Sequence, residues 1–352
     1  MSIIRLPGLI DVHVHLRDPG QTHKEDFFTG TSSALAGGFT TVLDMPNNIV
    51  PITTQERLEE KIQSAKNQTV CDIGFYFGSL GDTIEEFQKI KDTVFGLKLY
   101  LNITTGGFII TPEKLNSIFQ SWTSSQPILC HAEEDMIDMI VEIVRKIRKP
   151  VHICHTSSKN ELQKIIKAKN EELPITCGVC PHHLFLNETI AQHLEGYGKM
   201  KPPLHTQKDT EFLWNNLQYI DVIESDHAPH TKEEKNSENP PFGVPGLETT
   251  LPLLLHAEKE GKLSRNKIIS LCYQRPMEIF HIPQQPDTFV EIEDREFIIS
   301  DDHLFTKCQW TPFKGMKARG IIKKVTIRGK TVFENGNILI NRGEGIVIYP
   351  ET

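Results

Sequence analysis

The sequence has 352 residues, of which 38% are hydrophobic and 24% are charged, a composition typical of a folded protein with one large core. The formal net charge of −8 argues against nucleic acid or a membrane surface as the main partner, although a local site could still bind a small anion. We find no signal peptide and no apolar run long enough to span a bilayer. Seven cysteines spread along the chain indicate reduced thiols, and we therefore expect a cytoplasmic protein.

Strand-like and helix-like segments alternate along most of the chain. Short β-rich runs are predicted at 9–17, 39–45, 71–77, 95–101, 127–131, 151–155, 175–180 and 222–226. The helical segments between and after them end near 36, 66, 91, 147, 169, 219 and 260, and a further helix opens at 111–113. Thr53 and Glu56 form a predicted capping box for the helix that reaches Lys66. Eight strands alternating with helices predict an α/β protein with a (β/α)8 TIM barrel.

The two chain ends are predicted to form a small β appendage outside the barrel. Hairpin-like runs at 323–328 and 331–339, the second around Asn335-Gly336, would join the first few residues in a minor sheet. We therefore expect a barrel over residues 7–285 and an appendage over residues 1–6 and 286–352. The acidic and polar segment 232–239 is expected to be a mobile loop.

Metal-ligand residues recur where the predicted barrel strands end. His13 and His15 are two residues apart, so in a strand both side chains point the same way and can bind one ion. The other candidates are Lys98, His131, His155 and Asp226. Each alone could be structural, but the carboxyl ends of barrel strands meet at one face, and the joint placement favours a metal site.

Lys98 lies inside a strand of apolar residues, where a buried charge would be costly. It could extend outward or pair with an acid. Alternatively, burial lowers the pKa of its amine, and the neutral amine reacts with carbon dioxide to give a carbamate that bridges two cations. One zinc would then bind His13, His15, carbamylated Lys98 and Asp226, and the other would bind the carbamate, His131 and His155, with a hydroxide between them.

Several motifs together identify a family resemblance. The segments 11–17 (DVHVHLR), 96–102 (GLKLYLN) and 226–230 (DHAPH), with further matches at 6–8, 246–249 and 310–313, resemble dihydroorotases of the amidohydrolase superfamily. The greatest similarity is to the dihydroorotase domain of the animal-type multifunctional pyrimidine-synthesis protein. The resemblance implies reversible cyclisation of N-carbamoyl-L-aspartate to L-dihydroorotate, with Asp226 as the catalytic residue that exchanges the proton.

The resemblance also implies the substrate contacts. Arg17, Asn47 and His230 would hold the carboxylate and ring of the substrate, because a guanidinium binds a carboxylate through two hydrogen bonds. Thr104 would belong to a lid loop to which Gly106 and Gly107 give freedom of movement. The remaining substrate-binding residues implied by the family are Lys201 and Gly243.

Three positions depart from the family pattern. Lys201 stands where arginine or asparagine is common, and Thr105 stands where the animal-type lid has an aromatic residue. Some animal-type members bind a third zinc through a cysteine, matched here by Cys154, and a glutamate, where this chain has Gly178. Because that glutamate is missing, we expect two zinc ions rather than three.

Two other functions stay open at this point. A dihydropyrimidinase, hydantoinase or allantoinase would share the barrel and the metals, so only substrate-side residues discriminate. Arg17 with Asn47 and His230 favours a substrate that bears a carboxylate beside the ring. An inactive dihydroorotase-like scaffold should have lost metal ligands, whereas all six are present here. We expect a homodimer that acts on a small molecule, binds no nucleic acid or membrane, and associates with other pyrimidine-synthesis enzymes.

Overall fold

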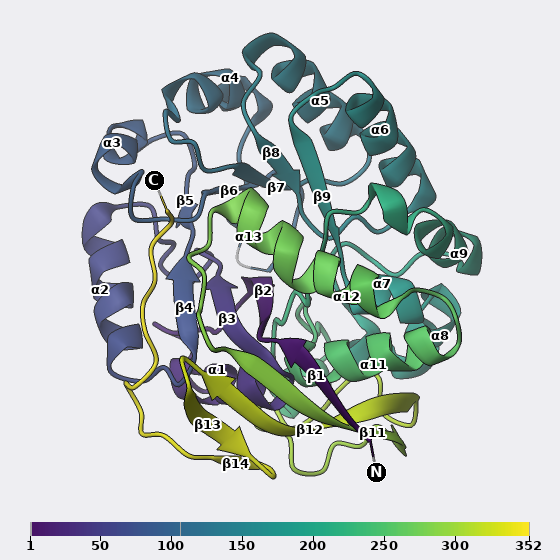
Figure 1. The fold of residues 1–352 in the computed structure, drawn as a ribbon. Coiled ribbons are helices and arrows are strands. Elements are labelled where there is room, and N and C mark those ends of the chain that lie inside the picture. The colour runs from purple at the N-terminus through teal and green to yellow at the C-terminus, as the bar shows by residue number, and fades with distance from the viewer. Residues whose placement is uncertain (1, 106, 352) are drawn as a thin grey trace.

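The computed structural model describes residues 2–105 and 107–351, which form a ring of parallel strands surrounded by helices, with an antiparallel sheet beside it (Figure 1). The ring strands are β2 (Leu9–Val14), β3 (Phe39–Asp44), β4 (Asp72–Phe75), β5 (Phe77–Gly78), β6 (Leu97–Tyr100), β7 (Ile128–His131), β8 (Val151–Ile153), β9 (Ile175–Val179) and β10 (Val222–Ile223). Tyr76 alone separates β4 from β5, so they form the single strand predicted at 71–77. The order along the wall follows the order in the sequence, as in a (β/α)8 barrel.

The barrel closes between its first and last strands. Val14 bridges His227 in parallel, and the backbone N–H of His15 donates to the carbonyl of His227 at 2.8 Å. Every residue of β2 and β3 is buried, because in a parallel sheet one face lines the barrel and the other lies under helices. The predicted TIM barrel is confirmed.

The described residues form thirteen α-helices, most of which lie around the barrel wall. They are α1 (Phe27–Ala36), α2 (Gln55–Lys66), α3 (Phe87–Ile90), α4 (Pro112–Ser121), α5 (Asp135–Ile147), α6 (Lys159–Asn170), α7 (Pro181–Phe185), α8 (Glu188–Leu194), α9 (Gln207–Asn215), α10 (Lys232–Lys235), α11 (Leu247–Lys259), α12 (Arg265–Ile269) and α13 (Arg275–Phe280). The capping box predicted from Thr53 and Glu56 is wrong. Thr54 is the N-cap of α2 and accepts from the N–H of Arg57 at 3.4 Å.

The chain ends form the predicted β appendage. Its strands are β1 (Ile3–Pro7), β11 (Phe289–Ile298), β12 (Lys317–Ile327), β13 (Lys330–Glu334) and β14 (Asn337–Ile338), in the order β1-β11-β12-β13-β14 and all antiparallel. The sheet packs on the barrel through α11 and β12 (Figure 1). Near the end of the chain, Val347 pairs with Ile73 of β4 and so extends the barrel wall. The division of the chain at residues 6/7 and 285/286 stays a prediction.

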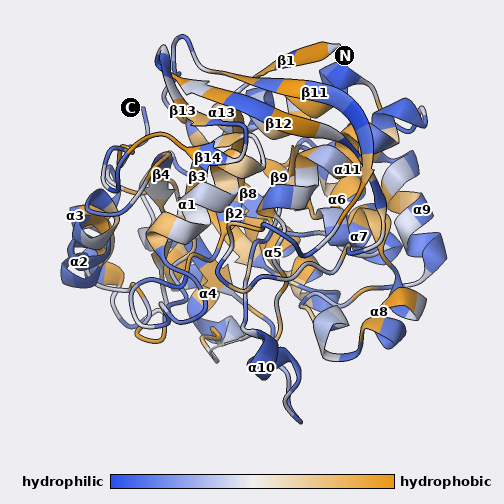
Figure 2. Cartoon of the chain, turned by 90° about the horizontal axis from the view of Figure 1, so that it is seen from below, coloured by the Kyte–Doolittle hydropathy of each residue, from blue (hydrophilic) through white to orange (hydrophobic). Residues whose placement is uncertain are grey.

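The segment 232–239 is not wholly the loop that we expected. It contains the short helix α10, which stands away from the body as a hydrophilic projection in Figure 2. Lys235 is 1% exposed, and its amine donates to the carbonyls of Lys199, Pro241 and Gly243 at 2.9, 3.0 and 2.9 Å. This lysine ties the segment to the barrel. Within the described residues, no helix is both long and apolar enough to cross a membrane.

Candidate active site

The six predicted ligand residues converge at the carboxyl ends of the barrel strands. Their exposed fractions are 1% for His13, 8% for His15, 0% for Lys98, 2% for both His131 and His155, and 7% for Asp226. They come from β2, β6 and β7 and from the segments directly after β2, β8 and β10. Residues far apart in the sequence thus meet in one buried cluster.

His13, His15 and Asp226 form the first half of this cluster. Asp226 Oδ1 lies 3.3 Å from Nε2 of His13 and 3.0 Å from Nε2 of His15. On the other side of each ring, Nδ1 of His13 lies 3.2 Å from Glu224 Oε2, and Nδ1 of His15 lies 2.7 Å from Asn47 Oδ1. Each imidazole therefore has an acceptor oxygen on both sides, and a cation bound at Nε2 would leave its single proton on Nδ1, facing Glu224 or Asn47.

This proton placement makes the first group suitable for a cation. Burial lowers the pKa of His13 to about 4 and that of His15 well below its usual value, so both rings are neutral at pH 7. A neutral ring has one proton for its two acceptors, so a cation among Asp226 Oδ1 and the two Nε2 atoms would satisfy the contacts that the protons cannot. The donor set of two imidazoles and a carboxylate is one that zinc binds.

His131 and His155 form the second half of the cluster. His131 Nε2 lies 3.3 Å from Glu133 Oε1, so its proton is on Nε2, and Nδ1 presents its lone pair to His155 Nε2 at 3.0 Å. Burial lowers the pKa of both rings. The rings of His13 and His155 are 5.1 Å apart between centroids, so the two halves are adjacent. The pair supplies two more nitrogen ligands.

Lys98 is enclosed in the barrel. Its Nζ lies 3.0 Å from Cys154 Sγ and 5.0 Å from the ring centroid of Tyr100, and no ion pair of Lys98 is found among the residues that the structure describes. The two structural alternatives for this lysine, extension into solvent and pairing with an acid, therefore both fail. The buried amine of Lys98 lies beside the four candidate histidine ligands, where a carbamate formed on it could bridge two ions.

Glu224 is a site residue that the sequence analysis missed. It is fully buried directly after β10, and together with His13 and Cys154 it forms a further group whose ligand-type atoms lie within 4.8 Å of one another. The signal was present in the sequence. Glu224 stands two residues before Asp226, and alternate residues of a strand share a face.

Arg17 and His230 lie together beside the cluster. Lys24 Nζ lies 3.2 Å from His230 Nδ1 and can only donate, so His230 Nε2–H donates to the carbonyl of Phe242 at 2.9 Å. Arg17 Nη2, 3.1 Å from that same Nε2, consequently has no acceptor there. Arg17 is 5% exposed, and no ion pair of its guanidinium is found in residues 2–105 and 107–351. Its Nε donates to the carbonyl of Pro229 at 3.2 Å, and a buried guanidinium with no direct ion pair is suited to binding a carboxylate ligand.

The loop that carries Gly243 packs against His230. Gly243 has φ +131°, and a Cβ at this position would lie 2.5 Å from the carbonyl oxygen of Ala228 and 3.2 Å from His230 Cδ2. Only glycine therefore fits. Trp310 also holds the backbone of His230 in place, because its indole N–H donates to the carbonyl of His230 at 2.7 Å.

Thr104 and Lys201 lie at the edge of the site. Thr104 is half-buried, while its neighbour Thr105 donates to the carbonyl of Phe242 at 2.9 Å, which joins the loop after β6 to the loop of Gly243. Lys201 Nζ lies 3.2 Å from Glu133 Oε2. Of the two expected hinge glycines, Gly106 is outside the described residues, and Gly107 has open space around it. Lid movement stays a prediction.

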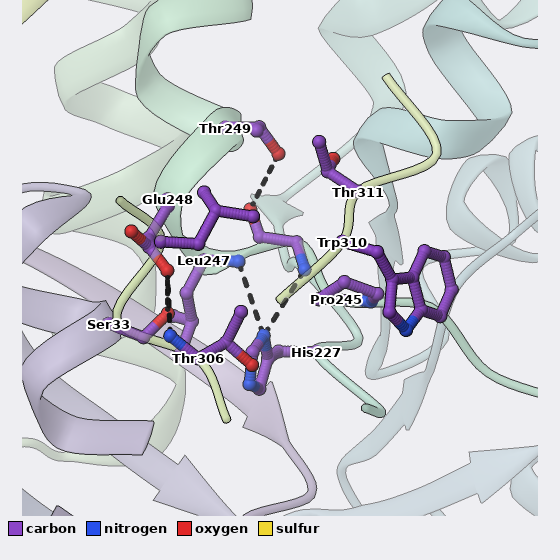
Figure 3. A pocket seen from close by; sticks show the side chains of 11 residues that line it. Ser33, His227, Pro245, Leu247, Glu248, Thr249, Thr306, Trp310 and Thr311 are labelled. Carbon is purple, nitrogen blue, oxygen red and sulfur yellow. Dashed lines mark hydrogen bonds between the residues drawn. The ribbon is translucent and has the colours of Figure 1, made fainter. Parts of the chain in front are cut away.

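Figure 3 shows a small pocket where three of the sequence motifs meet, 226–230, 246–249 and 310–313. His227 follows Asp226, and its Nδ1 accepts from the N–H groups of Gly246 and Leu247 at the start of α11, at 3.2 and 3.5 Å. Glu248 accepts from the N–H of Thr306 at 3.0 Å. The first turn of α11 thus anchors the segment that carries Asp226.

Comparison with known proteins places this architecture in a family. The amidohydrolase family model matches residues 4–176. The dihydroorotase of Pyrococcus horikoshii is 36% identical over 98% of this chain and 84% of its own length. The multifunctional protein CAD of Squalus acanthias is 43% identical over 98% of this chain, which spans only 16% of that relative.

Solved structures share the fold at lower identity. The L-hydantoinase (dihydropyrimidinase) from Arthrobacter aurescens superposes with a TM-score of 0.94 at 23% identity, covering 99% of this chain and 89% of its own. The inactive dihydroorotase-like domain of a CAD-like multifunctional protein from Chaetomium thermophilum gives a TM-score of 0.84 at 24% identity, covering 99% and 100%. Both similarities show the barrel architecture.

Proposed function

The chain belongs to the dihydroorotase family of amidohydrolases, and we propose that it interconverts N-carbamoyl-L-aspartate and L-dihydroorotate in de novo pyrimidine synthesis. One observation carries the proposal. A buried guanidinium without a carboxylate partner among the described residues, that of Arg17, lies beside a cluster of six ligand-type residues. The cluster suits amide hydrolysis, and Arg17 suits a substrate whose ring bears a carboxylate.

We infer two zinc ions per chain. His13, His15 and Asp226 would hold one and His131 and His155 the other, with carbamylated Lys98 between them. Bound zinc would polarise the ring carbonyl and lower the pKa of a water molecule in the site. The proposal is supported by the acceptors Glu224, Asn47 and Glu133, each of which can take the proton of one nitrogen of His13, His15 or His131 and leave the other nitrogen for a cation.

Asp226 would move the proton. In hydrolysis its carboxylate takes a proton from the attacking water and delivers it to the ring nitrogen as the carbon–nitrogen bond breaks. Cyclisation reverses these steps. Arg17 would hold the substrate carboxylate, and His230 would join it by exchanging its hydrogen bond with the carbonyl of Phe242 for one with the substrate. Asn47, whose oxygen faces His15, would turn its amide nitrogen to the substrate. Gly243, Thr104 and Lys201 would line the remaining wall.

A substrate comparison tests the function. We expect the purified protein to hydrolyse L-dihydroorotate, and to hydrolyse dihydrouracil and hydantoin, which lack the carboxylate, far more slowly. Preference for the neutral rings would assign the chain to a dihydropyrimidinase or hydantoinase activity instead. No turnover of any ring by the zinc-loaded protein would favour a scaffold role.

We also propose a setting for the reaction. All seven cysteines are buried free thiols, which supports a reducing, cytoplasmic location. Relatives named as multifunctional proteins support association with other enzymes of pyrimidine synthesis. A homodimer is proposed as well, and sedimentation of the purified chain would test it.

A further inference from the structure

Glu224 is a carboxylate enclosed among the histidines of the site. Its Oε2 lies 3.2 Å from His13 Nδ1 and 3.7 Å from His152 Nε2. Its Oε1 accepts from the backbone N–H of His155. A single side chain from the end of β10 therefore contacts residues of β2 and β8 and the segment that follows β8. A carboxylate with no exposed surface is costly to bury, so these hydrogen bonds are needed to keep it there.

The space for this carboxylate comes from a glycine on the neighbouring strand. Gly178 of β9 pairs with Val222 of β10, and a Cβ built on Gly178 would lie 2.4 Å from Glu224 Oε1 and 2.5 Å from its Cδ. Any larger residue at 178 would force the carboxylate to move. The carboxylate of Glu224 thus fills the space that a side chain at position 178 would need. The sequence analysis did not link these two residues.

The contact with His13 has a direct consequence for the cluster. Since Glu224 accepts the Nδ1 proton, the ring orientation is fixed and Nε2 is directed at Asp226 Oδ1, 3.3 Å away. His15 and His131 are held in the same way, by Asn47 and Glu133. A carboxylate acceptor also makes the opposite nitrogen a stronger electron donor than a neutral amide does.

We propose that Glu224 is a positioning residue that aligns His13 for metal binding, and that Gly178 is required because it leaves room for Glu224. This inference rests on the proposed metal site. It needs no dihydroorotase activity, because its test measures zinc binding directly. Failure of the substrate assay would therefore leave it standing.

The test is the zinc affinity of metal-depleted protein, measured by competition with a chromogenic chelator. Loss of such a hydrogen-bonding partner typically weakens metal binding by about 10–100-fold. We expect Glu224→Ala to show a loss of this size. Glu224→Gln should fall between Glu224→Ala and the unchanged protein, because one amide oxygen replaces two carboxylate oxygens. The thermal melting of each metal-free variant is measured alongside to show that it folds.

Gly178→Ala gives an independent route, because it displaces the carboxylate without removing it. We expect weaker zinc binding from Gly178→Ala in the presence of Glu224 and no further loss in the Glu224→Ala background. The matched control is Glu161→Gln. Glu161 is a buried carboxylate that accepts from the N–H groups of Ser157 and Ser158 and forms no hydrogen bond or ion pair with the six ligand residues. The zinc affinity of the Glu161→Gln variant should equal that of the unchanged protein.

Two results would overturn the proposal. If Glu224→Ala and Gly178→Ala lower the melting temperature of the metal-free protein but leave zinc affinity intact, Glu224 is structural only. If the unchanged protein binds three zinc ions and Glu224→Ala binds two with unaltered affinity, Glu224 is a ligand of a further ion together with His13 and Cys154.

Discussion

The two sides of the barrel mouth are built differently. On the metal side, barrel strands deliver the side chains, and an acceptor oxygen fixes the second nitrogen of three of the four histidines, His13, His15 and His131. On the substrate side, loops carry Arg17, His230 and Gly243, and their positions depend on contacts with other loops. Residues at the strand ends hold the metal ligands in a rigid arrangement. Loops can vary without disturbing the barrel, so they can adapt the site to different ring substrates.

The substitution Lys98→Ala, in β6 on the metal side, should have the largest effect on metal binding and activity. The variant should lose zinc and essentially all activity, because no other side chain can take the place of the bridging carbamate. Added short carboxylic acids should restore part of both by occupying the vacated space. Zinc content by atomic absorption is measured beside the rate. Full occupancy and activity in the variant would show that Lys98 is not a bridge.

The second prediction separates metal binding from proton transfer. Asp226→Asn should lower the rates of hydrolysis and cyclisation by about 10²- to 10⁴-fold, the usual contribution of a general acid–base group. Zinc should stay at least partly bound, since the histidines remain. Steady-state rates in both directions and metal content are compared. A variant that retains normal rates with bound zinc would remove Asp226 from the mechanism.

The third prediction concerns the substrate side. Arg17→Met should keep the fold and both metals but lower kcat/KM for dihydroorotate on the order of 30- to 4,000-fold, the cost of about 2–5 kcal/mol for a lost desolvated charge contact. The slow hydrolysis of dihydrouracil serves as the control and should not fall. Equal losses on both substrates would show that Arg17 supports the site rather than binding the carboxylate.

The fourth prediction is a pair of opposed pH profiles. Ring closure consumes one proton, so the equilibrium should shift toward dihydroorotate about tenfold for each unit that the pH falls. Hydrolysis needs Asp226 ionised, so its rate should rise as the pH rises through the pKa of Asp226. Burial raises this pKa above its usual value. Cyclisation needs the proton held and should gain rate as the pH falls. Initial rates measured both ways must mirror each other; parallel profiles would exclude Asp226 as the proton carrier.

The smallest effect is expected at the lid loop. Thr104→Ala should raise KM by less than about tenfold, the loss of a single neutral hydrogen bond. Thr105→Ala removes a contact with the carbonyl of Phe242 and should act on KM through the loop of Gly243 to a similar extent. A large fall in kcat from either variant would mean that this loop belongs to the catalytic machinery.

The same contrast explains how much could be predicted from the sequence. Strand periodicity alone placed His13 and His15 on one face, and barrel topology brought Lys98, His131, His155 and Asp226 to them. The contact between Thr105 and Phe242 depends on how loops pack, for which the local sequence holds no period. The helix at 232–235 was missed although Thr231 and Glu234 form its capping box, which is a local signal. Glu224 was missed although it stands two residues before Asp226. Its fit against Gly178, which lies 46 residues away in the printed sequence and next to it in the barrel, could not be predicted from the sequence.

The central claim is that zinc held by the strand-end cluster hydrolyses a ring that bears a carboxylate. Its most direct test is titration of metal-depleted protein with zinc while the hydrolysis of L-dihydroorotate is followed. We predict no hydrolysis without metal and a rate that rises to a plateau at two zinc ions per chain. Undiminished hydrolysis by the metal-free protein, or none at any zinc concentration, would contradict the account.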